Sequence, residues 1–92
     1  MRSLHVKRLR VANREYLITE YAARRMAMRG ISPADACGVL GYPTRVRPSV
    51  NDPHRLVLQR TMEGRRLVVV VEGIPGLEPW DVVTAWVEGQ DE

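Results

Sequence analysis

The spacing of apolar residues changes at Pro43, and this change is the strongest constraint on the fold. Residues 19–41 have an apolar stripe at helical spacing, whereas residues 44–87 contain short, mostly alternating segments separated by turn residues. Helices followed by a run of hairpin-joined strands favour an α+β fold. In such a fold the strands pair antiparallel and the helices cover one face of the sheet.

Signals for the start and end of a helix occur twice between residues 19 and 41. Thr19 suits an N-cap, and Gly30 suits the position after a helix end, where φ is positive. Ser32 and Pro33 then suit the cap and first residue of a second helix, which residues 41–43 end. We therefore expect two short helices joined by a tight glycine link.

Four segments after residue 43 have the composition of strands. Residues 66–72, RLVVVVE, place apolar side chains on both faces, which predicts a central strand covered on both sides. Glu63 and Gly64 form a two-residue hairpin signal before it. The strands are expected at residues 44–50, 55–62, 66–72 and 81–87.

Residues 4–11 and 16–18 also resemble strands and precede the helices. The predicted fold class is α+β, with two N-terminal helices packed on an antiparallel sheet of roughly four to five strands. We expect one domain, residues 1–92. It comprises N-terminal strands in 1–18, a helix pair in 19–41, antiparallel strands in 44–87 and an acidic tail in 88–92.

The size and the cysteine count narrow the class of protein. A chain of 92 residues fits one domain, and its single cysteine, Cys37, excludes an internal disulfide. With only His5 and His54 as imidazole ligands, we expect no metal site and no cofactor. Neither a signal peptide nor a membrane-spanning run is present, so we expect a cytoplasmic protein without a membrane partner.

Charge is distributed very unevenly along the chain. Residues 1–66 hold all 14 Lys and Arg residues, and all but Lys7 are arginine. Residues 67–92 hold no Lys or Arg and six of the 11 Asp and Glu residues. A basic segment with an acidic end suggests a polyanionic partner, and arginine suits phosphate because its planar fork binds two oxygens.

The arginines of the first helix and the strand after the helix pair can form one basic surface. Arg25 and Arg29 are four residues apart and project together, and Arg45 and Arg47 share one strand face. If the helix lies across the sheet edge, these side chains bind phosphate; alternatively, they are solvated arginines whose stems cover apolar surface. The nucleic-acid-binding candidates are Arg24, Arg25, Arg29, Arg45, Arg47 and Arg60.

Other side chains have both a structural and a chemical interpretation. His54 follows a turn and can transfer protons near neutral pH. Trp80 and Trp86 suit a core or an interface, and otherwise stacking on RNA bases. Cys37 suits a buried, inert position, and Asp35 matches the dipole at a helix start.

Residues 19–32, TEYAARRMAMRGIS, resemble a helical signature, T-x-H-A-x-x-R-M-x-x-R-G-I-S. This signature belongs to a small bacterial family described as a domain of unknown function. The segments GRRLVVVVE and DVVTAWV are similar to its second signature, at Gly64, Arg65, Val82, Val83, Thr84 and Trp86. The resemblance covers most of residues 16–87.

This family is grouped with RelE/ParE-like toxins, whose fold is two helices on an antiparallel sheet. The resemblance implies a ribonuclease that cuts messenger RNA with basic and aromatic residues and without a metal, or a relative that has lost this activity. The family histidine is replaced here by Tyr21. Tyrosine donates a proton but is a poor base, because its reference pKa is about 10.

Two hypotheses from different classes follow. The first is an RNA-cleaving or RNA-binding protein, with Tyr21, Arg25 and His54 as catalytic candidates. The second is a non-enzymatic interaction domain that binds an antitoxin-like protein, or a second copy of itself, through a sheet edge.

Overall fold

The computed structural model describes the backbone of residues 5–89 and the side chains of residues 7–89. In chain order the elements are β1 (His5–Val11), β2 (Arg14–Thr19), α1 (Glu20–Met28), α2 (Pro33–Gly41), β3 (Arg45–Pro48), β4 (Arg55–Met62), β5 (Arg65–Glu72) and β6 (Trp80–Val87). Leu4 of the first expected strand and residues 90–92 of the acidic tail lie outside this part. No described helix is long and apolar enough to cross a membrane.

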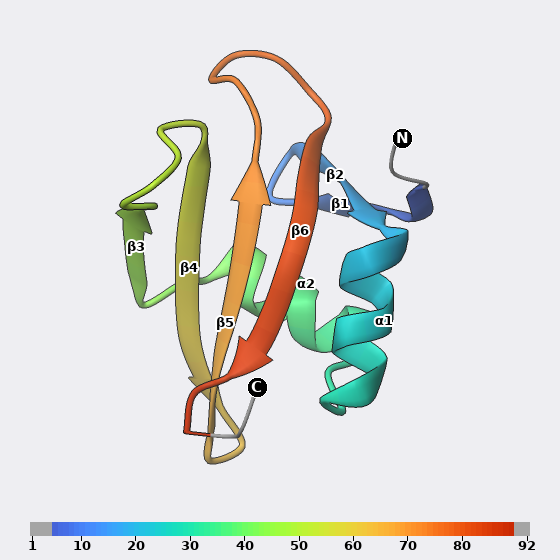
Figure 1. The fold of residues 1–92 in the computed structure, drawn as a ribbon, viewed down its shortest axis with the longest axis vertical. Helices are drawn as coiled ribbons and strands as arrows, with labels where there is room; N and C mark the ends of the chain where they lie inside the picture. The colour runs from blue at the N-terminus through green and yellow to red at the C-terminus, as the bar shows by residue number, and fades with distance from the viewer. Residues whose placement is uncertain (1–4, 90–92) are drawn as a thin grey trace.

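The strands of the described residues form one six-stranded sheet in the order β1-β2-β6-β5-β4-β3 (Figure 1). The expected α+β class is confirmed, but the sheet is mixed, and the prediction of four to five antiparallel strands was wrong. Strands β2 and β6 are parallel and share only three register pairs, Tyr16–Trp80, Leu17–Asp81 and Ile18–Val82. Such a pairing joins distant segments, so no local sequence pattern reveals it.

The helices do not lie at the N-terminus, as the predicted fold class stated, because a β-hairpin precedes them. Ala12 and Asn13 both have positive φ, 51° and 65°, which is the conformation of a tight two-residue hairpin turn. This turn joins β1 to β2 as antiparallel partners. The chain therefore enters α1 directly from a strand of the sheet.

The predicted helix boundaries are confirmed by the capping contacts. The Thr19 hydroxyl accepts a hydrogen bond from the Ala22 N–H at 3.1 Å and caps α1. Gly30 has a φ of 68°, and Ser32 caps α2 with Pro33 in its first turn. The turn between β4 and β5 is at Glu63 and Gly64, as expected.

Asp35 fastens the link between the two helices. Its carboxylate accepts a hydrogen bond from the Ser32 N–H at 3.0 Å and one from Arg65 at 3.1 Å. The Ser32 N–H contributes most to lowering the pKa of Asp35, the Ser32 hydroxyl and Arg65 lower it further, and burial opposes them. Arg65 also donates to the Gly30 carbonyl at 3.0 Å, so one arginine of β5 holds both sides of the link.

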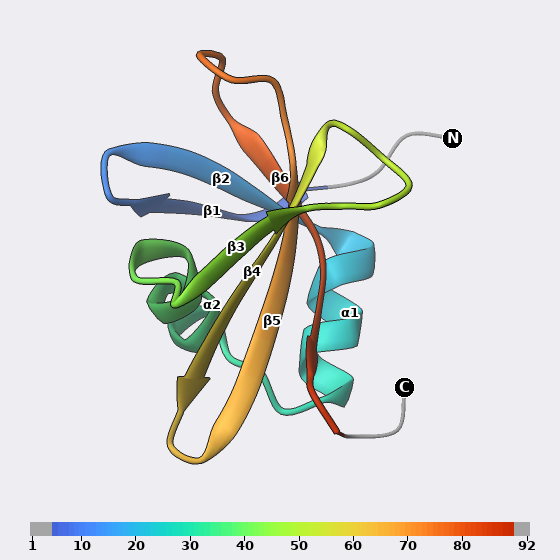
Figure 2. The same ribbon diagram turned by 90° about the vertical axis from the view of Figure 1, so that its left-hand side faces the viewer.

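The two faces of the sheet have different cover (Figure 2). Both helices contribute to a core with Leu58, Leu67 and Val69, and this core also buries Trp80. The alternate residues of the same strands point to the other face, where Val57, Val68 and Val70 form a smaller cluster with Trp86 partly covering it. In Figure 1 α2 lies behind the strands, and the viewer sees this second, open face.

Candidate nucleic-acid interface

Helix α1 lies beside β6 and completes one wall of the open face (Figure 1). Because β2 pairs only with the first residues of β6, carbonyl groups farther along β6 are available to α1. The Thr19 hydroxyl donates to the Val82 carbonyl at 3.2 Å, and Arg29 Nη1 donates to the Ala85 carbonyl at 2.8 Å. These two hydrogen bonds fasten both ends of α1 along β6.

The residues that α1 directs toward the open face form a hollow with two residues of β6. Tyr21, Arg25, Arg29, Thr84 and Trp86 line this hollow, which has a volume of about 390 Å³. We call it the basic hollow. The guanidinium of Arg25 lies over the Tyr21 ring, 4.9 Å from its centre, which is the geometry of a cation–π contact. Tyr21 itself is 55% exposed.

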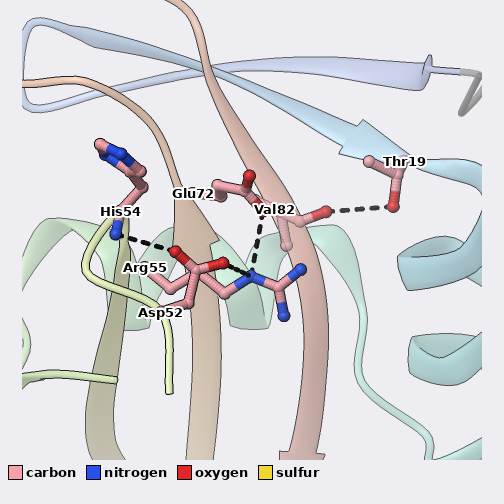
Figure 3. A network of polar contacts seen from close by, with 6 residues as sticks. All are labelled: Thr19, Asp52, His54, Arg55, Glu72 and Val82. Carbon is pink, nitrogen blue, oxygen red and sulfur yellow. Dashed lines mark hydrogen bonds and ion pairs between the residues drawn. The ribbon is translucent and has the colours of Figure 1, made fainter. Parts of the chain in front are cut away.

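A middle hollow of about 450 Å³ adjoins the basic hollow and shares Tyr21 and Thr84 with it. An arginine held between carboxylates lies in its wall (Figure 3). Arg55 Nε is 3.0 Å from Glu72 Oε1 and 3.4 Å from Asp52 Oδ2. Arg55 and Glu72 are direct cross-strand partners on β4 and β5, so the sheet register fixes this contact.

A third hollow of about 320 Å³, the acidic hollow, adjoins the middle one and shares Glu72 and Asp81 with it. The segment between β5 and β6 supplies its other side, with Gly73, Ile74, Leu77 and Pro79. His54 also lines this hollow. Its backbone N–H donates a hydrogen bond to Asp52 Oδ1 at 3.0 Å (Figure 3).

We call the three adjoining hollows the β6 groove. It is basic at the Arg25 and Arg29 end and acidic at the Glu72 and Asp81 end. Asp52 adds a further carboxylate beside Arg55, so among the described residues two carboxylates contact this arginine. Within residues 7–89, no three His, Cys, Asp or Glu side chains are grouped so that they could hold a metal ion.

Three of the residues proposed from the sequence, Tyr21, Arg25 and Arg29, line one hollow. Arg24 is one residue away but pairs with Glu20 at 3.3 Å and does not line the basic hollow. His54 lines the acidic hollow, whereas the side chain of His5 lies outside the described part.

The remaining arginines are dispersed. Arg45 and Arg47 pair with Gln59 and Val57, and therefore share the open face. Their strand is three strand spacings from β6 in the sheet order, about 14 Å. Arg60 points to the helix side and donates to the Tyr42 carbonyl at the end of α2, at 2.6 Å.

Sequence reasoning did not select Arg55, Glu72 or Thr84 as site residues. Arg55 and Glu72 begin and end their strands, and only the β4–β5 register brings them together. Trp86 was given two interpretations, and it is partly buried on the open face, whereas Trp80 belongs to the core. The hairpin turn at Glu63 and Gly64 is the sequence signal for this pair. Continuous antiparallel pairing from Met62 with Arg65 next to the turn leads to Arg55 opposite Glu72.

Residues 18–87 match the model of a protein family, Domain of unknown function (DUF4258), and the chain therefore belongs to this family. The match includes α1, α2 and every residue that lines the β6 groove. Neither the curated proteins nor the solved structures include a significant match to the chain.

Proposed function

We propose that this domain binds single-stranded RNA in the β6 groove and is related to the RelE/ParE-like toxins. The observation that carries the proposal is the basic hollow. It combines two arginines, Arg25 and Arg29, with two aromatic rings, Tyr21 and Trp86, on an open surface. Single-stranded nucleic acid requires both kinds of group, because its phosphates are charged and its bases have exposed faces.

The arginines are suited to phosphate because other contacts orient them. Arg29 uses one nitrogen to hold the Ala85 carbonyl, and its guanidinium has further N–H groups for a ligand. Arg25 is oriented by the Tyr21 ring. A guanidinium that is held in place loses less side-chain entropy when it binds the oxygens of a phosphate.

The aromatic rings favour a single strand over a duplex. Trp86 lies on the open face and lines the basic hollow, where an unpaired base can stack on it. Base–aromatic stacking contributes about 1–3 kcal/mol for each base. In an A-form duplex the base faces are stacked on one another, and side chains do not reach them.

The relationship to RelE/ParE-like toxins is supported by two helices packed on a sheet and by the basic and aromatic composition of the groove. Two features differ from what the resemblance implied. The sheet contains a parallel pair, and Tyr21 occupies the position of the signature histidine.

RNA cleavage is a second candidate activity, favoured by the position of Tyr21 and His54 on neighbouring hollows with shared walls. In such a reaction the 2′-hydroxyl attacks the adjacent phosphorus and the bond to the 5′-oxygen breaks, which leaves a 2′,3′-cyclic phosphate and a 5′-hydroxyl. One group takes the 2′-hydroxyl proton, and another protonates the leaving oxygen. His54 suits the first role and Tyr21 the second.

Binding of the full chain to labelled single-stranded RNA, measured by fluorescence anisotropy over a range of salt concentrations, tests the proposal. We expect affinity to fall steeply with salt, and Arg25→Gln to reduce the slope of log affinity against log salt by about 0.7. Arg24→Gln is the matched control. It removes the same charge from the same helix, but Arg24 pairs with Glu20 and does not line the basic hollow.

Absence of RNA binding at low salt would contradict the proposal and favour the alternative, a protein partner or a second copy bound at a sheet edge, β1 or β3. Equal effects of the two arginine variants would show that net charge, not the basic hollow, determines binding. RNA products with cyclic phosphate ends, lost in Tyr21→Phe or His54→Gln, would establish cleavage in addition to binding.

A further inference from the structure

The phosphate and stacking contacts proposed above make no use of the Glu72 carboxylate of the acidic hollow. This hollow adjoins the middle hollow, so a strand bound along β6 reaches it. The Glu72 carboxylate in its wall accepts hydrogen bonds and cannot donate them, so it suits a part of the strand that carries N–H donors rather than a phosphate. We infer that the acidic hollow binds a guanine base of the RNA and that Glu72 determines this specificity. The inference rests on the proposed RNA binding.

The acidic hollow has the construction of a base pocket. Ile74 and Leu77, which are 53% and 61% exposed, supply apolar surface along one side. Glu72 supplies hydrogen-bond acceptors on the other side. Apolar walls with a few placed polar groups are the usual composition of a site for a flat organic ring.

Glu72 is held in place but retains capacity to accept hydrogen bonds. Its Oε1 receives Arg55 Nε at 3.0 Å, and no described residue donates to its Oε2. A carboxylate has about four acceptor positions, so one contact leaves room for a ligand. Figure 3 shows the Glu72 carboxylate between His54 and Val82, next to the Arg55 side chain that orients it.

Among the four RNA bases, guanine matches a carboxylate best. Its N1–H and N2 amino groups are adjacent donors that point the same way, and one carboxylate can accept from both. Cytosine and adenine place an acceptor nitrogen beside their amino group, and uracil places two carbonyl oxygens around its single N–H. Each of these brings an acceptor toward the negative charge of Glu72.

The imidazole of His54 supplies a second contact of the opposite kind. His54 lines the same hollow, and an imidazole N–H can donate to guanine O6 or N7, which are both acceptors. In this arrangement the N1–H and N2 amino groups of guanine donate to Glu72, and its O6 or N7 atom accepts from His54.

Oligouridine with one central guanosine tests the inference, compared with the same oligomer containing inosine and with plain oligouridine. Inosine lacks only the N2 amino group. Loss of a hydrogen bond to a charged acceptor predicts about tenfold weaker binding of the inosine oligomer to the full chain. Glu72→Gln should abolish this difference between the guanosine and inosine oligomers, which is measured within the one variant.

Asp52→Asn is the matched control, because Asp52 also contacts Arg55 but does not line the acidic hollow. It should retain the preference for guanosine over inosine. Equal binding of the two oligomers by the wild-type protein overturns the inference, and so does an unchanged preference in Glu72→Gln. If plain oligouridine also fails to bind at low salt, the RNA-binding proposal itself is wrong, and this outcome is distinguishable from the others.

Discussion

The helix side of the sheet and its open face use the same strands for different tasks. On the helix side, alternate residues of β4, β5 and β6 enter a core that both helices close, and Leu67, Val69 and Val82 have no exposed surface there. On the open face, Val57, Val68 and Val70 of β4 and β5 form a smaller cluster, against which Val83 and Trp86 of β6 pack. The groove lies along β6 on this face.

The difference shows how a small domain separates stability from recognition. Successive side chains of a strand point to opposite faces of the sheet. A substitution at one position therefore changes one face, while the adjacent residue keeps its contacts on the opposite face. Core residues contribute through buried apolar area, whereas the groove residues keep exposed surface that a ligand can cover. Substitutions on the two faces should therefore have separable effects.

The largest expected effect is on the helix side. Leu67→Ala removes a fully buried side chain of β5 and should lower the free energy of unfolding by about 2–5 kcal/mol, because the cavity it leaves closes only in part. Urea unfolding followed by circular dichroism measures this. Val46→Ala on the exposed β3 edge is the control and should change stability by less than about 0.5 kcal/mol. Similar losses in both variants would contradict the distinction.

An intermediate effect is expected on the open face, and it concerns binding. Trp86→Leu keeps apolar contact with the Val57, Val68 and Val70 cluster but removes the flat ring. RNA affinity measured by anisotropy should fall by about 1–3 kcal/mol, the usual contribution of base stacking. Trp86→Phe retains a ring and should lose much less. A leucine variant that binds as tightly as the wild type would exclude stacking at this position.

The smallest expected effect is on the helix link. The pKa of Asp35 is lowered from its ordinary value of 3.8, mainly by the Ser32 N–H, so folding favours its charged form. Its contribution to stability is therefore present above pH 3.8 and is lost as the pH falls through the lower folded value. Relative to Asp35→Asn, the wild type should gain about 0.5 kcal/mol at neutral pH, which declines in acid.

Unfolding free energies of the wild type and Asp35→Asn between neutral and acidic pH measure this difference. Binding of RNA at neutral pH should be unchanged, since Asp35 lines none of the hollows of the groove. A difference in stability that does not vary with pH would show that the charge of Asp35 makes no contribution.

Sequence reasoning succeeded where a feature depends on neighbouring residues. Thr19, Gly30 and Ser32 determine the helix ends through contacts within a few positions, and Glu63 with Gly64 determines a hairpin turn in the same way. The parallel pairing of β2 with β6 could not be found, because it joins Ile18 to Val82 without any local signal.

The candidate site was partly predictable for the same reason. Helical spacing grouped Arg25 with Arg29 and predicted one surface with Arg45 and Arg47. The structure instead places the two helix arginines beside Trp86 of β6, which is an interior strand of the sheet. Arg60 was included by charge alone, although strand alternation directs it to the helix side. The pair of Arg55 and Glu72 was missed, because it exists only through the register of two strands.

The two hydrogen bonds that fasten α1 to β6 have a consequence for how this architecture can diversify. The Thr19 hydroxyl and Arg29 bond to the carbonyl groups of Val82 and Ala85, and a carbonyl is present whatever side chain occupies those positions. Given Thr19 and Arg29, the attachment of α1 therefore does not depend on which side chains occupy positions 82 and 85 of β6. Positions 21, 25, 84 and 86 can exchange their chemistry while the backbone stays fixed, which makes the groove a platform for new ligands.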